Sequence, residues 1–479
     1  MLFMGIDVGT QGVRCVVSDE KGRLAAACSA AFERLNIAQR EGWYEQDPAA
    51  WVAAAETAVR GCMAEIADPE EIVSISIDGT SGTVLALDEN NRPLTNGIMY
   101  NDPRAAEQAK RIHAAMGHIE RKLGYKFGAS FSLPRVLWIH DELPEIYARA
   151  SVIAHQADYI AGMLCGCYNI SDYSNALKTG YDLIDGCWPA EYADVLGLEP
   201  EKFPKVIAPG AAIANVSAEA AARFGLSERT MVTGGSTDGY ASALAAGAVS
   251  AGKWASIIGT TFVLKGATSR LIIDPNGSSY SHMLPSGEWM LGGAANLGGR
   301  VLNGARGEKS FDEMNAEAEA MIPTGVRCYP LTGRGERFPF VLPGCEAFYM
   351  GDVTGNKLYP AIMEGVGFAE RFAFEHMQAL GCEIGDVIYT TGGACRSELW
   401  LKIRASILNR QLMVPEVVDA AMGSALLAAS GHFGSLENAA EQMIRYSRTV
   451  FPDPALVEKY EAIYQQFRRD MGAVYGLEV

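Results

Sequence analysis

Apolar runs separated by glycine-rich turns are the first regular pattern in this chain. The N-terminal stretch MLFMGIDVGTQGVRCVVSDEKG holds an apolar run ending at Asp7, a Gly-Thr-Gln-Gly turn, and a second apolar run ending at Ser18-Asp19. Apolar runs of this length, bounded by glycine, predict two buried strands joined by a tight turn. The turn explains its glycines, but it does not explain an acid on a strand that should be buried.

Related patterns occur at four more places. Residues 71–93 (EIVSISIDGTSGTVLALDENNRP) and 253–269 (KWASIIGTTFVLKGATS) again predict strand, glycine turn and strand. In residues 231–252 a strand is expected to pass through a turn at 234–239 into a helix of Ala, Ser and Gly. Residues 386–407 predict a β-branched strand, a Gly-Gly turn and a helix with an apolar i, i+4, i+8 stripe.

Helices are predicted between these strands. Asp47 followed by Pro48 suits an N-cap and first helical position, opening a helix through about Ile66. A further helix is expected around 361–380, and a charged surface helix over about 454–472.

The stretches IDVGTQGVRCVV and SIIGTTFVLKGA form an imperfect internal echo about 250 residues apart. A chain of 479 residues is also too long for one ordinary core. We therefore expect two similar α/β halves, residues 1–248 and 249–479, each opening with a Gly-Thr hairpin.

The composition narrows the class of partner. The net charge of −17 disfavours nucleic acid and anionic membranes, and an apolar fraction of 49% is typical of a globular protein. Ten cysteines form no C-x-x-C, and seven histidines show no metal-binding spacing, which favours reduced cysteines in a cytoplasmic protein. No signal peptide is visible, and the small apolar stretch 240–249 is too short to span a membrane.

Three common nucleotide and hydrolase motifs are absent from the sequence: G-x-x-x-x-G-K-[ST], G-x-G-x-x-G and G-x-S-x-G. The glycine turns at strand ends are the alternative, since successive backbone N–H groups and threonine hydroxyls can cradle phosphate oxygens. The turn in TTGGA is also expected to open a helix, whose N-terminus favours an anion. Any single turn is more often only a turn, but several together favour a nucleotide bound between two lobes.

Two acids have a structural and a functional interpretation. Asp7 is either a turn-initiating residue or the ligand of a Mg²⁺ ion that also binds phosphate. Asp238 is either the N-cap of the Ala/Ser helix or a general base for a substrate hydroxyl. The sequence by itself leaves both pairs open.

Nearly all of the chain resembles the FGGY family of carbohydrate kinases, of the actin-like ATPase superfamily. SFSLPRVLWIHDE (130–142) is similar to the family's first signature, with Arg135 where lysine is usual. TGGACRSELWLKIRASI and DAAMGSALLAASG are similar to the C-terminal signature region, with Asp419 where glutamate is usual. Stretches similar to the pentulose-kinase branch, of the D-ribulose kinase and xylulose kinase-like type, are SIDGTSGTVLALD, ISDYSNALKTGYD, GTTFVLK, YSHMLPSGEWMLGGAANLGG and GERFPF.

The resemblance implies a fold and a set of roles. The fold would be α/β, with two actin-like (ribonuclease H-like) ATPase domains, a duplicated core and a central cleft. Asp7 would organise Mg²⁺ and the phosphate, and Asp238 would be the catalytic base. The ATP-binding residues would be Gly9, Thr10, Gln11, Gly12, Gly259, Thr260, Thr261, Gly392, Gly393, Ala394, Ser397 and Trp400. The sugar pocket would be lined by Asp78, Thr80, Ser81, Gly82, Asn101, Asp102, Arg104 and Asp238. A Met-His pair usual in the pocket turn is absent here, so which of residues 80–82 contacts the sugar stays open.

The implied activity is ATP-dependent phosphorylation of a ketopentose, with D-ribulose or D-xylulose as the first expectations. Other polyols and ketoses (glycerol, L-ribulose, a pentitol or a hexulose) are alternatives within this class. Two further alternatives are an actin-like ATPase that does not act on sugar and a sugar-binding protein without activity. Family members are often dimers, so a homodimer is implied as well.

Overall fold

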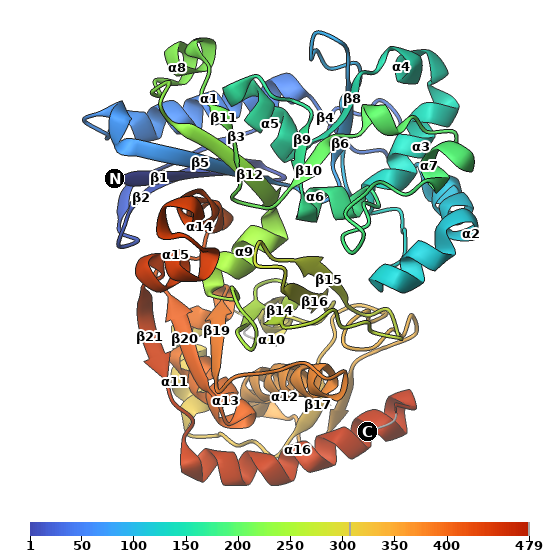
Figure 1. The fold of residues 1–479 in the computed structure, drawn as a ribbon. Coiled ribbons are helices and arrows are strands. Elements are labelled where there is room, and N and C mark those ends of the chain that lie inside the picture. The colour runs from blue at the N-terminus through green and yellow to red at the C-terminus, as the bar shows by residue number, and fades with distance from the viewer. Residues whose placement is uncertain (306–307, 478–479) are drawn as a thin grey trace. The chain divides into compact units, whose positions relative to one another are not determined.

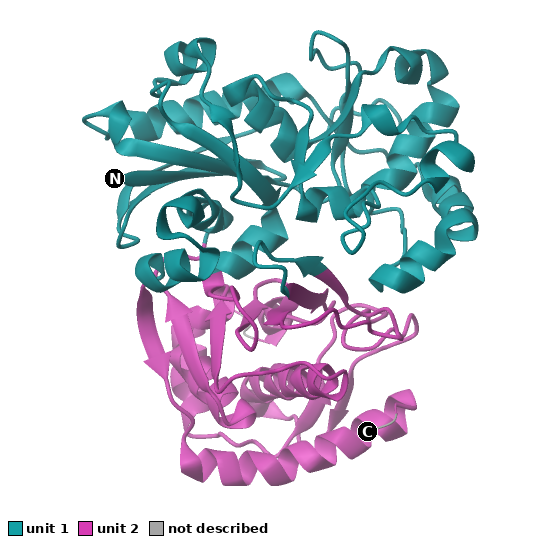
Figure 2. Cartoon of the chain, viewed as in Figure 1, with its two compact units in different colours: residues 1–245, 282–288, 419–444 teal, residues 246–281, 289–418, 445–479 magenta. Residues whose placement is uncertain are grey.

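The computed structural model describes residues 1–305 and 308–477 (Figure 1). Figure 2 shows the two compact units into which the chain divides: unit 1 comprises 1–245, 282–288 and 419–444, and unit 2 comprises 246–281, 289–418 and 445–479. The division expected from the sequence assigns residues 419–444 to the second half. They lie in unit 1 because helix α14 (Ala420–Phe433) packs on strands β1 (Leu2–Val8) and β5 (Ile72–Gly79).

A six-stranded sheet in the order β11-β12-β5-β1-β2-β3 forms the centre of unit 1. β1, β5 and β12 run parallel, whereas the hairpin partners β2 and β3 are antiparallel to their neighbours. All seven residues of β1 are buried, as an unbroken apolar run predicts for a strand covered on both faces. The other strands of this sheet are β2 (Gly12–Asp19), β3 (Leu24–Ala31), β11 (Ala212–Asn215) and β12 (Met231–Thr237).

The two apolar runs of residues 71–93 are both strands, but they do not pair with each other as the first two strands do. β5 lies in the central sheet, whereas β6 (Val84–Leu87) pairs with β7 and β8 in a sheet of order β4-β7-β6-β8. The turn between them, with Gly82 at a φ of 92°, redirects the chain to this second sheet. The remaining strands of unit 1 are β4 (Glu45–Gln46), β7 (Gly97–Ile98), β8 (Val152–His155), β9 (Ile170–Asp172) and β10 (Lys205–Ile207).

Helix α1 (Pro48–Met63) begins as the sequence predicts. The Asp47 carboxylate accepts a 2.9 Å hydrogen bond from the Ala49 N–H, and Pro48 is the first helical residue. The other helices of unit 1 are α2 (Ala106–Leu123), α3 (Ser132–Glu142), α4 (Pro144–Arg149), α5 (Gln156–Cys165), α6 (Tyr173–Lys178), α7 (Glu191–Asp194), α8 (Ala218–Phe224), α9 (Asp238–Ala246, whose last residue falls in unit 2), α14 and α15 (Leu436–Met443).

The central sheet of unit 2 repeats the topology of unit 1. Its order is β15-β16-β14-β13-β19-β20-β21, so β16-β14-β13-β19-β20 corresponds to β3-β2-β1-β5-β12 with the same parallel and antiparallel pairs. The duplicated α/β core inferred from the internal echo is therefore confirmed. The strands of unit 2 are β13 (Trp254–Ile258), β14 (Phe262–Thr268), β15 (Tyr280–Met283, whose last two residues fall in unit 1), β16 (Trp289–Ala294), β17 (Arg327–Tyr329), β18 (Phe348–Met350), β19 (Val387–Thr391), β20 (Gln411–Pro415) and β21 (Tyr446–Val450).

Two long helices of unit 2 lie where the sequence predicts them. They are α12 (Leu358–Ala379) and α16 (Pro454–Tyr475), and both bury an apolar face in the core of this unit. The other helices are α10 (Leu302–Ala305), α11 (Phe311–Glu319) and α13 (Glu398–Leu408). None of the helices in the described ranges is long and apolar enough to cross a membrane.

Small residues allow helix α14 to approach the central sheet of unit 1 closely. A Cβ atom built on Gly5 of β1 would lie 1.8 Å from the Ala421 carbonyl oxygen, and one built on Gly423 would lie 2.0 Å from the Ala241 carbonyl oxygen of α9. Backbone therefore packs directly on backbone at these points, and a side chain at either glycine would have to push an element away.

Replacing Gly5 by alanine is expected to lower the free energy of unfolding by about 3 kcal/mol, because the added methyl group overlaps the backbone of α14. Gly431, on the same helix with open space around its Cβ position, offers a matched control. Gly431→Ala should be neutral or stabilise by up to about 1 kcal/mol. Urea unfolding midpoints measure both effects, and a wild-type midpoint for Gly5→Ala would contradict the close contact.

Candidate active site

Three acids in unit 1 stand at the ends of neighbouring parallel strands. Asp7 of β1 and Asp78 of β5 are register partners, and both are buried. Asp238 directly follows β12, the strand beside β5, and is the first residue of α9. Since the carboxyl ends of parallel strands meet at one edge of a sheet, the three carboxyl groups lie at the same edge.

Asp7 is held in an environment that favours its neutral form. Burial raises its pKa from 3.8 to about 6, and the charges of Asp419 and Asp238 act in the same direction. Interaction with the neighbouring Asp78 carboxyl and with the guanidinium of Arg14, 3.3 Å from Oδ2, partly offsets this rise in the pKa. The other oxygen, Oδ1, is buried and has no hydrogen-bond partner among the described residues.

Asp78 lies deeper than the sequence-based sugar-pocket prediction implies. It is fully buried, and the Ser424 hydroxyl of α14 donates to its Oδ2 at 2.6 Å. Burial and the neighbouring Asp7 raise its pKa well above the usual range, so the pair is expected to share a proton. Ser424 was not among the predicted site residues, and its hydroxyl belongs to this acid cluster.

The pKa of Asp7 predicts a pH-dependent stability. The neutral carboxyl is favoured in the folded protein, so its contribution is complete below pH 3.8 and is lost as the pH rises through about 6. The difference between these pKa values corresponds to about 3 kcal/mol. Asp7→Asn should therefore gain stability relative to the wild type between pH 4 and 7, measured by urea unfolding.

Asp19, at the other end of β2, is the control for this measurement. Hydrogen bonds from Arg23 and Lys21 outweigh its slight burial and lower its pKa, so Asp19→Asn should be less stable than the wild type at neutral pH, with a difference that vanishes in acid. A stability difference for Asp7→Asn that is independent of pH would contradict the assigned environment.

Asp238 opens helix α9 without the glycine-rich turn expected from the sequence. Strand β12 continues through Gly234 and Gly235 to Thr237, with a register shift against β5 between Thr233 and Ser236, so the expectation of a turn at 234–239 is wrong. The Asp238 carboxylate accepts a 2.6 Å hydrogen bond from the Gly239 N–H. An acid at the first helical position stabilises the helix by its interaction with the helix dipole.

The first glycine turn, residues 9–12, is fixed by its carbonyl groups. The Gly9 N–H donates to the Gly12 carbonyl at 2.9 Å, and the carbonyls of Thr10 and Gln11 accept from Gln46 Nε2 (2.8 Å) and the Phe32 N–H (2.9 Å). A rigid, partly exposed turn beside Asp7 suits a phosphate-binding loop.

Unit 2 contains a cavity of about 580 Å³. Six of the eight residues predicted to bind ATP in this half line it: Gly259, Thr260, Gly393, Ala394, Ser397 and Trp400. Thr261 and Gly392 are not among its lining residues. Gly392 instead brings the two glycine loops together, because a Cβ there would lie 2.5 Å from the Ile258 carbonyl oxygen. No sequence motif indicated the other residues that line the cavity: Gly299, Arg300, Leu302, Asn303, Phe311, Asp312, Asn315, Tyr359 and Arg396.

The TTGGA turn does not open the long helix that follows it. Residues 393–396 form a short 3₁₀ helix, and α13 begins afterwards, with the Ser397 hydroxyl accepting from the Trp400 N–H at 3.1 Å. The expectation that this turn supplies the N-terminus of a long helix to an anion is therefore wrong.

The aromatic rings of Phe311, Tyr359 and Trp400 make the cavity suitable for a planar base.

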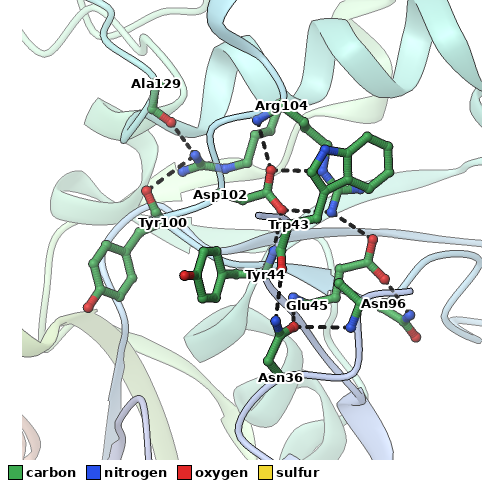
Figure 3. Close-up of polar contacts among 11 residues, drawn as sticks. Asn36, Trp43, Tyr44, Glu45, Asn96, Tyr100, Asp102, Arg104 and Ala129 are labelled. Atoms are coloured by element: carbon green, nitrogen blue, oxygen red, sulfur yellow. Dashed lines mark hydrogen bonds and ion pairs between the residues drawn. The ribbon is translucent and has the colours of Figure 1, made fainter. Parts of the chain in front are cut away.

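Asp102 and Arg104 of the YNDPR stretch are engaged with each other (Figure 3). Asp102 accepts from Arg104 Nε at 2.9 Å, from Arg104 Nη2 at 2.7 Å and from the Tyr44 N–H at 2.6 Å. Arg104 also pairs with Glu45 at 2.7 Å, and its guanidinium lies 3.8 Å from the ring centre of Trp43. These contacts join residues 43–45, which precede α1, to the YNDPR stretch. Arg104 and Glu45 also line a separate cavity of about 420 Å³ in unit 1.

The pocket turn is held on one side by helix α5. Gln156 Oε1 accepts from the Thr80 N–H at 2.8 Å and from the Thr80 hydroxyl at 2.7 Å. The hydroxyl of Ser81 is buried and has no partner among the described residues, and Asn101 is exposed.

The acids of unit 1 suit a Mg²⁺ ion that also binds phosphate oxygens and water better than they suit a metal site made of protein ligands alone. Mg²⁺ is commonly held by one or two carboxylates together with phosphate oxygens and water. The unpartnered Asp7 Oδ1 suits that arrangement. Within the ranges that the structure describes, no group of three or more His, Cys, Asp or Glu residues could hold a metal ion.

The duplicated sheets, the acidic strand ends and the aromatic cavity define an α/β enzyme of the actin-like ATPase fold. Residues 2–245 match the N-terminal domain, and residues 254–432 the C-terminal domain, of the FGGY family of carbohydrate kinases. The chain belongs to this family and is a carbohydrate kinase, a phosphotransferase of a family that uses ATP.

Several individual relatives span the whole chain. A xylulose kinase of Bacillus subtilis is 28% identical over 97% of this chain and 95% of its own, and a gluconokinase of the same organism is 28% identical over 95% and 92%. The solved structure of a kinase from Brucella ovis, described as a xyloylose kinase, has a TM-score of 0.88, 26% identity and full coverage of both chains.

Proposed function

We propose that this kinase transfers the γ-phosphoryl group of ATP to a hydroxyl of a ketopentose, with D-xylulose or D-ribulose as substrate. The observation that carries the proposal is the similarity to xylulose kinases over 97% of the chain, combined with an acid cluster at the strand ends of unit 1. The gluconokinase relatives make D-gluconate the second candidate substrate.

Each unit would contribute a separate part of the reaction. Gly259, Thr260, Gly393 and the aromatic wall of the unit 2 cavity would bind the nucleotide. In unit 1, the turn at 9–12 would bind phosphate oxygens, and Asp7 would hold Mg²⁺, which neutralises charge on the phosphates when bound. The sugar would lie along Thr80, Ser81, Gly82 and Asn101. The side chains of Asp78, Asp102 and Arg104 would surround these residues and support them.

Asp238 would act as the general base. It accepts the proton of the sugar hydroxyl while the hydroxyl oxygen forms a bond to the γ-phosphorus and the bond from that phosphorus to the β–γ bridging oxygen breaks, releasing ADP. Phosphoryl transfer passes through a loose transition state, so alignment and charge stabilisation supply most of the rate. The proton transfer adds to them.

The substrate is tested by ADP release coupled to a spectroscopic readout, with D-ribulose, D-xylulose, L-ribulose, L-xylulose, ribitol, glycerol and D-gluconate. A ketopentose should give the highest kcat/KM, since a site built to bond a given hydroxyl strongly rejects analogues that lack it. A highest value for gluconate or glycerol would overturn the proposed substrate class. ATP turnover that ignores every sugar would favour the actin-like ATPase alternative.

Two further properties complete the proposal. Ten cysteines, all free, favour a reducing compartment such as the cytoplasm. A homodimer follows from the family resemblance, and light scattering on the purified protein tests it.

A further inference from the structure

Arg135 of helix α3 is fully buried, and its guanidinium donates to four backbone carbonyls. The distances are 2.7 Å to Gly82, 3.0 Å to Ser130 and 3.4 Å to Tyr100, and Ala129 is the fourth acceptor. Figure 3 labels two of these acceptors, Tyr100 and Ala129. The two Nη atoms divide these acceptors between them, with Tyr100 and Ala129 on one and Gly82 and Ser130 on the other. The guanidinium therefore joins three separate pieces of chain.

These pieces are the pocket turn at 79–82, the YNDPR stretch at 100–104 and the segment 128–131 before α3. The first two carry every residue, apart from Asp78 and Asp238, that the family resemblance assigns to the sugar pocket. Burying a guanidinium is unfavourable, and burial lowers the pKa of Arg135 to about 9 even with Asp102 nearby. Four carbonyl acceptors compensate for the lost water, so the cation and the three segments stabilise one another.

The pocket turn is thereby held from two sides. Gln156 binds Thr80, as described above, and Arg135 binds the carbonyl of Gly82. The fit at Gly82 is tight, since a Cβ there would lie 2.5 Å from the Ser130 carbonyl oxygen. Between the two anchored residues lies Ser81, whose buried hydroxyl has no partner in the part of the chain that the structure describes. The hydrogen bonds at Thr80 and Gly82 therefore determine the positions that the Ser81 hydroxyl can reach.

We propose that Arg135 is a positioning residue for the sugar, which sets the spacing between the pocket turn and the YNDPR stretch without touching the substrate. This inference rests on the proposed sugar kinase function. A lysine, usual at this position in the resembling family, offers three donors from a single nitrogen, whereas the arginine fork presents donors from two separated nitrogens. A lysine ammonium therefore cannot reproduce the two pairs of hydrogen bonds that the two Nη atoms make.

The test compares Arg135→Lys and Arg135→Met with Arg111→Lys. Arg111 is the matched control because its exposed ion pair joins α2 to Asp141 on the same helix as Arg135. KM for the preferred sugar should rise about 10- to 100-fold in Arg135→Lys, as expected for a displaced pocket wall, and further in Arg135→Met. The KM for ATP and the sugar-saturated kcat should stay within about twofold of the wild type, and Arg111→Lys should change none of the three.

Several outcomes would overturn the positioning role. A folded Arg135→Lys with an unchanged sugar KM would do so, as would equal increases in the KM for sugar and for ATP. An Arg135→Lys protein that does not fold would show that the residue serves the stability of unit 1 as a whole. Each of these results leaves the proposed function standing. A wild-type protein that releases ADP with no sugar would instead overturn the proposed function, and the positioning role with it.

Discussion

Asp238→Asn is expected to lower sugar-dependent kcat by about 10²- to 10⁴-fold, the usual contribution of a general base. Asparagine keeps the size of the side chain and can still accept from the Gly239 N–H, so helix α9 should persist. Only the capacity to take the proton of the sugar hydroxyl is lost. KM for ATP should change little, because the residues proposed to bind adenosine lie in unit 2.

The measurement is steady-state ADP release with saturating sugar, alongside a thermal melt of the variant. Asp453→Asn is the matched control, since Asp453 caps helix α16 with its carboxylate and lies outside the proposed site. Turnover of Asp238→Asn within a few-fold of the wild type would refute its role as the base. Comparable losses in the Asp453 variant would show that any helix-capping acid produces the effect through stability.

Arg404→Met is expected to lower the free energy of unfolding by about 3–5 kcal/mol, the largest stability change we predict. Arg404 of α13 and Glu370 of α12 are both fully buried and are joined by two hydrogen bonds, of 2.8 and 2.7 Å. Arg404 also donates to the hydroxyls of Thr390 (2.8 Å) and Ser256 (3.1 Å). Removing the cation leaves the Glu370 carboxylate buried without its charge partner.

Urea unfolding of three variants separates the loss of charge from the loss of packing. Arg404→Met combined with Glu370→Leu should recover most of the lost stability, because an apolar pair can replace a buried ion pair with little net change. Arg229→Met removes an exposed ion pair with Glu70 and should cost about 0–1 kcal/mol. If the double variant is no more stable than Arg404→Met, the unpaired carboxylate is not the cause of the loss.

Local sequence signals predicted those parts of the structure that a few consecutive residues determine. The Asp47-Pro48 pair located the start of α1, and the glycine turns located the ends of β1, β13 and β19. Matching two short turns also revealed the duplication of the sheet, since each turn follows the first strand of its unit. Six residues that the family resemblance assigned to ATP, four of them in such turns, line one cavity of unit 2.

Contacts between distant parts of the chain carried no such signal. Ser424 donates to Asp78 across 346 residues of sequence, and nothing near either residue indicates the other. Strand β6 follows a turn that resembles the first hairpin, yet its pairing partners are β7 and β8. Phe311 and Tyr359 begin or lie in ordinary amphipathic helices, so their place in the cavity depends on how those helices pack.

The position of α14 in the sequence also determines when unit 1 can be completed during synthesis. Domains generally fold from the N-terminus as the ribosome releases them, but residues 419–444 of unit 1 emerge only after most of unit 2. Until then, Gly5 and its neighbours on β1 and β5 lack the helix that covers them. A recombinant fragment ending at residue 245 would therefore expose an apolar sheet face, and it should aggregate unless residues 419–444 are supplied with it.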